Sequence, residues 1–208
     1  SVSQVSAVST DGAATRWGNQ TLDQEAPSAN TFSQIAAGDA YTCALSTDAS
    51  VACWGDDTLG QATPPSGTFW QISAGNSHAC GVSTDGSVTC WGEDRYGEAT
   101  SPAGAFSQVS AGDAHTCAVS GDGSVACWGF DRYGQATPPT GTFSQVSAGS
   151  FHTCALSTDG SVACWGQNNH DQATPPTDTF PQVSAGWLHT CGVTASGAIA
   201  CWGANTDY

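Results

Sequence analysis

The sequence predicts an all-β protein folded as a single β-propeller. Three observations support this prediction: a Trp-Gly pair recurs every 37 residues, the repeated unit alternates as strands do and lacks helical periodicity, and Asp-Gly and Pro-Pro turn signals divide it. Each unit contains four short candidate strands, as a propeller blade does. Six Trp-Gly pairs favour six blades, with five blades as the alternative. The pairs begin at Trp17, Trp54, Trp91, Trp128, Trp165 and Trp202.

Residues 1–208 are therefore predicted to form one domain of six repeat copies. The first copy is degenerate, because it lacks the Gly-x-x-His-Thr-Cys-Ala stretch, and the last copy is incomplete. We expect these two ends to meet and complete a shared blade. In the five-bladed alternative, the first copy only patches the last blade. The copies span residues 1–31, 32–68, 69–105, 106–142, 143–179 and 180–208.

Each of the last five copies contains a hairpin in which two cysteines face each other. Cys154 and Cys164 lie symmetrically about Asp159, which requires a three-residue loop with Gly160 in the left-handed conformation. Counting outward places the cysteines at a non-hydrogen-bonded pair, with Cα atoms about 4.5 Å apart, which suits a disulfide. The same count pairs all ten: Cys43–Cys53, Cys80–Cys90, Cys117–Cys127, Cys154–Cys164 and Cys191–Cys201.

Zinc binding is the alternative for these cysteines, because a histidine stands two residues before four of the five pairs. Structural zinc sites use Cys-x-x-Cys spacing, which the sequence lacks, and Tyr41 replaces the histidine in one copy whose cysteines persist. Disulfides are therefore favoured, and no metal site is predicted. Five disulfides indicate an oxidising, extracellular compartment.

The two faces of each hairpin are both apolar, so each sheet is expected to pack between two neighbours. The periodic tryptophans are therefore expected in the core. The Phe-Ser-Gln-Val-Ser-Ala-Gly stretch predicts a strand near the axis, and Gly-Gln-Ala-Thr before Pro-Pro predicts a short outer strand.

The repeat Ala-Gly-x-x-His-[Ser/Thr]-x-Ala-Leu…Asp-Gly-x-Val-x-x-Trp-Gly-x-Asn-x-x-Gly-Gln resembles that of the regulator-of-chromosome-condensation propeller superfamily. Its short, cysteine-bearing form is similar to the extracellular repeats of crinkly-type plant receptor kinases. The resemblance covers essentially the whole chain and implies a propeller. It also implies a structural histidine that bonds backbone carbonyls. Because the superfamily includes an exchange factor, an enzyme inhibitor and receptor ectodomains, the resemblance does not imply one function.

The charge of the chain excludes several functions. Three Lys+Arg residues against 18 Asp+Glu residues give a net charge of −15, so binding to nucleic acid or to an anionic membrane surface is not expected. No apolar run reaches the roughly 18 residues of a spanning helix. The start of the chain lacks a signal-peptide pattern and an initiator methionine, and it is interpreted as a mature or excised segment.

Catalytic motifs are not found: the sequence has no nucleophile elbow and no His-Glu-x-x-His. No enzyme activity or cofactor is therefore predicted. Acidic pairs after Trp-Gly are interpreted as solvated surface, with weak Ca²⁺ binding as the alternative. They do not follow the spacing of a calcium loop.

The positions where near-identical repeats differ are the candidate binding residues. They follow Ala-Gly and Trp-Gly, and we expect them to lie in propeller loops. Two copies share Asp-Arg-Tyr-Gly, and Trp187 lies in the loop of a third copy. Such residues can anchor a sugar or a peptide, with an exposed, salt-bridged loop as the alternative. The candidates are Asp94, Arg95, Tyr96, Asp131, Arg132, Tyr133 and Trp187.

The sequence thus predicts a secreted, non-catalytic binding or assembly module with an extracellular protein or glycan as partner. A multivalent lectin and a propeller-type enzyme inhibitor are the alternatives. Asn19 begins an Asn-Gln-Thr sequon, which is predicted to carry a glycan only in a glycosylating host.

Overall fold

The computed structural model describes residues 5–8, 14–17 and 31–204. These residues form β-strands and no helix. A two-stranded sheet, β1 (Val5–Val8) with β2 (Ala14–Trp17), precedes five three-stranded antiparallel sheets. We call these five sheets blades 1 to 5.

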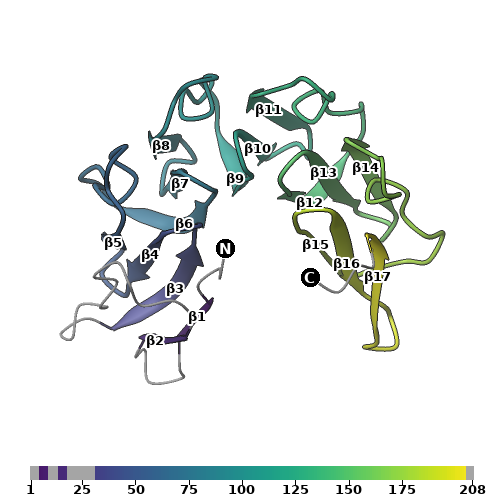
Figure 1. Ribbon diagram of the computed structural model, residues 1–208, viewed down its shortest axis with the longest axis horizontal. Helices are drawn as coiled ribbons and strands as arrows, with labels where there is room; N and C mark the ends of the chain where they lie inside the picture. The colour runs from purple at the N-terminus through teal and green to yellow at the C-terminus, as the bar shows by residue number, and fades with distance from the viewer. Residues whose placement is uncertain (1–4, 9–13, 18–30, 205–208) are drawn as a thin grey trace.

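Within each blade the three strands pair in chain order. In Figure 1 the blades follow an arc, with the first strand of each blade on the inner side and the third on the outer side. The strands of blades 1 to 5 are, in order, β3 (Phe32–Ala37), β4 (Tyr41–Ser46), β5 (Val51–Gly55); β6 (Phe69–Ala74), β7 (His78–Ser83), β8 (Val88–Gly92); β9 (Phe106–Ala111), β10 (His115–Ser120), β11 (Val125–Gly129); β12 (Phe143–Ala148), β13 (His152–Ser157), β14 (Val162–Gly166); β15 (Gln182–Ala185), β16 (His189–Val193), β17 (Ile199–Gly203).

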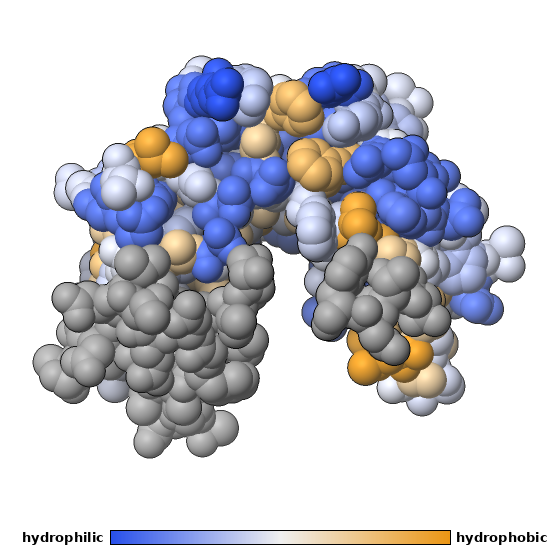
Figure 2. Space-filling model, in the orientation of Figure 1, coloured by the Kyte–Doolittle hydropathy of each residue, from blue (hydrophilic) through white to orange (hydrophobic). Residues whose placement is uncertain are grey.

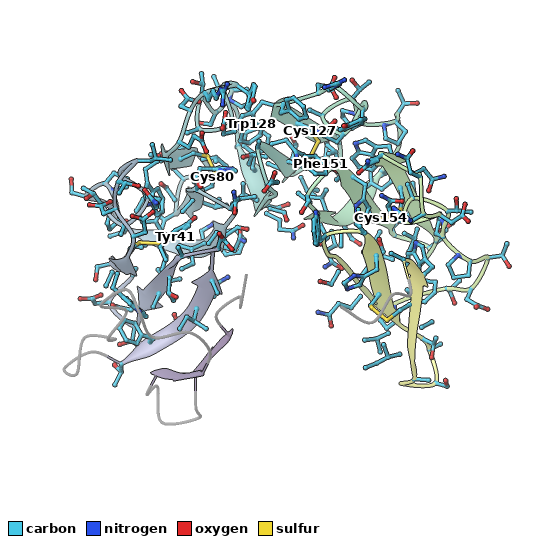
Figure 3. The ribbon with its side chains drawn as sticks, in the orientation of Figure 1. Tyr41, Cys80, Cys127, Trp128, Phe151 and Cys154 are labelled. Carbon is cyan, nitrogen blue, oxygen red and sulfur yellow. A yellow bond between two sulfur atoms is a disulfide. The ribbon has the colours of Figure 1, made fainter. Side chains whose placement is uncertain are left out.

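The hairpin register is the predicted one. Cys154 pairs with Cys164, and Gly160 in the turn between them has φ 86°. Every blade contains one such disulfide, with Cα atoms 4.0 to 4.1 Å apart, and no cysteine is free. Figure 3 shows the sulfur–sulfur bonds at Cys80, Cys127 and Cys154. The disulfides are thereby confirmed, and the zinc alternative is wrong.

Neighbouring blades bury the disulfide face of one sheet under the first strand of the next. Between blades 4 and 5, Phe180 and Val183 pack on Cys154 and Leu156, and none of these four side chains is more than 5 % exposed. Trp202 packs against the same cluster. The opposite face of blade 4, which carries Ala155 and Trp165, packs against Cys117 and Val119 of blade 3. Blade 4 is therefore packed on both faces, with its periodic tryptophan in the interface, as expected.

The preferred count of six blades is wrong, and the alternative of five is confirmed. The first copy supplies only β1 and β2, in which Val5 pairs with Trp17 as Thr42 pairs with Trp54 in blade 1. These strands therefore correspond to the second and third strands of a blade.

The predicted closure of the ring depends on residues 1–4, 9–13, 18–30 and 205–208. These segments, including Asn19 with its sequon, lie outside the described residues. In the described part of the chain, no helix is long and apolar enough to cross a bilayer.

Candidate functional site

Two loops of every blade emerge on one side of the molecule, which we call the loop face. Because the second and third strands are antiparallel, His115 at the start of β10 pairs with Gly129 at the end of β11. The loop between the first two strands and the segment after Trp-Gly therefore lie side by side. These are the two regions in which the repeats differ most, whereas the nearly invariant hairpin turns lie at the opposite side.

The segment after Trp-Gly is folded by two side chains. The Asp131 carboxylate accepts hydrogen bonds from the Ala136 N–H and the Thr137 hydroxyl, both at 2.7 Å. The buried Gln135 side chain accepts a hydrogen bond from the Tyr133 N–H at 2.9 Å. Because side chains satisfy these backbone donors, the segment forms turns, and the predicted fourth, outer strand is wrong.

The same pattern recurs in the other loops. The carboxylate or amide position is occupied by Asp57, Asp94 and Asn168, and the buried position by Gln61, Glu98 and Gln172. Asp94 and Asp131 were predicted from the sequence as ligand-binding residues. Their carboxylates instead stabilise the loop conformation by accepting hydrogen bonds within the loop. The interpretation of these acids as solvated surface missed this role. The signal for it was an Asp or Asn five residues before an alanine in four of the copies.

The backbone carbonyl of the buried loop residue links successive blades. Gln135 O accepts a hydrogen bond from Trp165 Nε1 at 2.9 Å and from the Thr153 hydroxyl at 3.0 Å, and both donors belong to the next blade. Glu98 O accepts the equivalent pair from Trp128 and Thr116.

Four aromatic rings form a continuous cluster on the loop face, here called the aromatic cluster: Tyr96, Phe130, Tyr133 and Phe151. The Tyr96 and Phe130 ring centroids lie 4.9 Å apart, and the Tyr133 and Phe151 centroids lie 5.7 Å apart. Phe130 joins the two pairs, at 6.3 Å from Tyr133 and 6.4 Å from Phe151. These distances suit edge-to-face aromatic packing. The cluster thus joins loops of blades 2, 3 and 4.

Two of the three cations of the chain lie beside this cluster. The guanidinium of Arg95 is 5.4 Å from the Tyr96 ring centroid, and that of Arg132 is 5.9 Å from the Tyr133 centroid. Both tyrosines remain more than 40 % exposed. Figure 2 shows orange apolar surface over blades 3 and 4 among blue hydrophilic groups, and Figure 3 places Phe151 there.

The structure therefore brings together four of the predicted binding residues, Arg95, Tyr96, Arg132 and Tyr133. Trp187 lies in the β15–β16 loop of blade 5 and is 59 % exposed. Phe130 and Phe151 were not among the predicted residues, although both occupy variable loop positions. Their contacts could not be read from the repeat, because they join different copies.

The inner end of the loop face is lined by the Ala-Gly-x loops of all five blades around an axial cavity of about 300 Å³. Asp39 and Asp113 are among the lining residues. Burial, and then the negative charges of Asp39 and Glu93, raise the pKa of Asp113 above its usual range. This end of the face is therefore acidic, whereas the cations lie beside the exposed tyrosines.

Three of the repeated histidines, His78, His115 and His152, lie between blades and bond a threonine of the next blade. His115 Nε2 is 2.8 Å from the Thr153 hydroxyl of the next blade. Because that hydroxyl donates its proton to Gln135 O, Nε2 is the donor. Burial, assisted by the neighbouring His78 and His152, lowers the pKa of His115 to about 3. The expected structural role fits, but the expected carbonyl partner is wrong: the partner is a threonine hydroxyl.

Metal-ligating side chains do not gather within residues 5–8, 14–17 and 31–204, where no group of three or more His, Cys, Asp or Glu residues could hold an ion. In the loops after Trp-Gly, the carboxylates of Asp57, Asp94 and Asp131 already accept hydrogen bonds from N–H and hydroxyl groups.

The fold is similar to those of two solved receptor-kinase ectodomains. The ectodomain of the Physcomitrella patens receptor kinase CR4 is 26 % identical with a TM-score of 0.83, over 97 % of this chain and 59 % of that one. The CRINKLY WD40 ectodomain of the Arabidopsis thaliana receptor kinase ACR4 is 25 % identical with a TM-score of 0.79, over 93 % and 77 %. The chain thus spans 59 % of the length of the moss ectodomain.

Prp20p from Saccharomyces cerevisiae shares the fold at 16 % identity, with a TM-score of 0.84 over 97 % of this chain and 70 % of that one. No curated protein sequence matches the chain. The family model of the regulator of chromosome condensation (RCC1) repeat matches residues 32–61, 71–98, 106–135, 143–172 and 182–208. Because these matches cover more than half of the sequence and correspond to the five blades, the chain belongs to the RCC1 repeat family.

Proposed function

We propose that the protein is a secreted, non-catalytic module that binds another protein through its loop face. The aromatic cluster is the observation that carries this proposal. Exposed tyrosines with adjacent arginines are typical of residues that dominate the energy of protein interfaces. Here they come from loops of three successive blades, where the repeats differ most.

Two further features support an extracellular binding role. Each blade contains a disulfide, and such bonds persist mainly in oxidising compartments. The similar structures at 25 and 26 % identity are receptor-kinase ectodomains. With a net charge of −15, the protein should associate most readily with a cationic partner, and added salt should slow that association.

The test is capture of a partner from the extracellular fraction of the source by the immobilised chain. The variant Tyr96→Ser/Tyr133→Ser removes two exposed rings of the aromatic cluster. Trp70→Ser is the matched control, because Trp70 is 48 % exposed on β6 and lies outside the cluster. We expect the double variant to bind a captured protein at least about tenfold more weakly, and the control to bind it unchanged.

Equal binding by all three proteins would contradict the proposal, because the partner would then use another surface. A glycan array supplies the second arm. Specific binding of one sugar class that is lost in Tyr96→Ser/Tyr133→Ser would assign the loop face to carbohydrate and replace the protein-binding proposal by the lectin alternative.

A further inference from the structure

The two arginines beside the aromatic cluster have no carboxylate partner among the described residues. Arg95 and Arg132 are both exposed, and each guanidinium lies near the ring of the tyrosine that follows it, at 5.4 and 5.9 Å from the ring centroid. Neither arginine forms an ion pair within the described structure, although the chain has 18 acidic residues. Both guanidinium groups are therefore available to an anionic group of another molecule.

The acids next to these arginines are occupied within their own loops. Both oxygens of the Asp94 carboxylate accept hydrogen bonds, from the Ala99 N–H at 2.8 Å and from the Thr100 hydroxyl at 2.7 Å. Both oxygens of Asp131 accept the equivalent pair. In each Asp-Arg-Tyr-Gly unit the acid therefore binds the loop backbone, and the arginine and the tyrosine remain on the surface.

The two Arg-Tyr pairs lie on neighbouring blades with an apolar ring between them. The Phe130 ring centroid lies 4.9 Å from that of Tyr96 and 6.3 Å from that of Tyr133. The sequence contains no other Arg-Tyr pair. The loops of blades 2 and 3 therefore offer two cationic positions on either side of one aromatic side chain.

We propose that this surface binds an acidic segment of the partner protein, in which two carboxylate side chains flank an apolar one. The inference rests on the proposed function, because it names the chemistry that the aromatic cluster recognises. A guanidinium can stack on an aromatic ring and still donate two parallel hydrogen bonds to a carboxylate. The apolar side chain between the two carboxylates packs on Phe130 and the adjacent tyrosines.

A phosphate or sulfate group matches this surface less well. Such groups have three acceptor oxygens, and proteins bind them where several donors converge, as at a cluster of arginines or a helix N-terminus. Here each arginine lies with its own tyrosine on a separate loop. One carboxylate for each arginine fits that arrangement, because a carboxylate and a single guanidinium form a complete bidentate pair.

The net charge of the chain and the contact chemistry of these loops act over different ranges. A net charge of −15 attracts cationic proteins during diffusion. The two arginines act on the groups that contact them, since exposed charges are screened beyond about 8 Å at physiological salt. A partner that satisfies both requirements has a cationic surface around an acidic contact segment.

The arginine Nε–H signals in the NMR spectrum of the isotope-labelled full chain provide a direct test, because only three arginines contribute to them. Alternate side chains of an extended segment share one face, so the probe is the capped peptide Gly-Glu-Ser-Leu-Ser-Glu-Gly. The control peptide is Gly-Gln-Ser-Leu-Ser-Gln-Gly. We expect saturable shifts of the Arg95 and Arg132 signals with the acidic peptide, and at least about tenfold weaker binding of the control peptide. Arg16 belongs to β2 and is the internal reference.

The variant Arg95→Gln/Arg132→Gln removes both cations of the surface and should abolish the preference for the acidic peptide. Arg16→Gln is the matched control, because it removes a cation elsewhere, and it should bind both peptides as the unaltered chain does. Arg95→Lys/Arg132→Lys keeps the charge but loses the planar fork, and it should bind the acidic peptide about threefold or more weakly. Unchanged amide signals of Ala99 and Ala136 in each variant show that the loops remain folded.

Three results overturn the inference. They are the absence of a saturable shift of the Arg95 and Arg132 signals, equal binding of the two peptides, and equal shifts of all three arginine signals. Saturable binding of inorganic sulfate at a lower concentration than the acidic peptide would also overturn it, by assigning the surface to another kind of anion.

A captured partner separates failure of this inference from failure of the proposed function. If Tyr96→Ser/Tyr133→Ser weakens binding of that partner and Arg95→Gln/Arg132→Gln does not, the loop face remains the binding surface and the acidic segment is wrong. If neither variant weakens binding, the proposed function is itself overturned. Loss of binding in both variants supports the inference.

Discussion

The hydroxyl of Tyr41 lies in the interface between blades 1 and 2, opposite Ala79. The other four blades have a threonine at the position of Ala79. In the next three interfaces a histidine meets a threonine, at Thr116, Thr153 and Thr190. Tyr41 instead donates to backbone carbonyls of His78 and Gly75 and packs in the same cluster as Ala79. The longer phenol thus fills the space of both the imidazole and the threonine side chain.

A double-mutant cycle on this pair should show strong coupling. Tyr41→His alone leaves a cavity and a buried imidazole without its hydroxyl partner, and Ala79→Thr alone overpacks the interface, so each should reduce the free energy of unfolding by about 1–3 kcal/mol. The double variant recreates the pair found in the next interface. Denaturant unfolding should show that it recovers at least about 1 kcal/mol relative to the sum of the single changes.

Acid should destabilise the protein well above the pH at which ordinary carboxylates titrate. Burial lowers the pKa of His78 and His152 to about 4 and that of His115 to about 3. As the pH falls below about 6.5, the unfolded chain therefore takes up protons that the folded chain excludes. Each histidine should reduce the free energy of unfolding by up to about 1.4 kcal/mol per pH unit, down to its folded pKa.

Urea unfolding between pH 7.5 and 4.5 measures this slope. Replacing one pair by the tyrosine–alanine pair, as His115→Tyr/Thr153→Ala, should reduce the slope by about one third. His170→Gln is the control, because it removes a histidine that is exposed in a loop outside the blade interfaces. A slope that the pair replacement does not alter would locate the acid sensitivity elsewhere.

Glu98→Gln should stabilise the protein at neutral pH. Glu98 is a fully buried carboxyl at a position where three other copies have glutamine. Burial raises its pKa, and the negative charges of Glu93 and Asp94 raise it further. We expect a gain of about 1 kcal/mol at pH 7, which should shrink as the pH falls and the carboxyl becomes neutral in the folded state.

Calorimetric melting of Glu98→Gln at pH 7.5 and 4.5 tests this. The reverse change, Gln135→Glu, is the matched control and should lower the melting temperature at pH 7.5. If both variants shifted in the same direction, the buried charge would not be the cause.

Asp131 should be replaceable by asparagine but not by alanine. Its carboxylate accepts from the Ala136 N–H and the Thr137 hydroxyl, and Asn168 accepts the equivalent N–H in the next loop. Asp131→Asn should therefore change stability by less than about 0.5 kcal/mol, whereas Asp131→Ala should cost about 1–2 kcal/mol, as lost capping bonds do. Amide exchange at Ala136 provides a local readout, and equal protection in both variants would contradict the role assigned to Asp131.

The hairpin could be predicted residue by residue because its determinants are local. Cys154 and Cys164 are separated by ten positions, and the turn between them has one acceptable geometry with glycine at position 160. The alternation of side chains then places Leu156 with the cysteines and Trp165 on the other side. Burial of both faces followed from their composition.

The number of blades and the binding surface could not be predicted in the same way. The count depends on how many strands the first copy forms, and that copy is degenerate and lacks seven residues of the repeat. The outer strand was wrongly predicted because the sequence does not reveal that Asp131 and Gln135 bond nearby backbone groups. The aromatic cluster depends on packing between different copies, such as Tyr96 on Phe130, for which the repeat contains no signal.

The backbone carbonyl of Gln135 accepts hydrogen bonds from Trp165 and Thr153, which both belong to the next blade. The unfolding of one blade is therefore expected to weaken the blade that follows it. The backbone carbonyls of Glu98 and Gln135 each accept hydrogen bonds from both the indole and the threonine hydroxyl of the next blade. When blade 2 or blade 3 unfolds, the blade that follows it therefore loses both of these bonds.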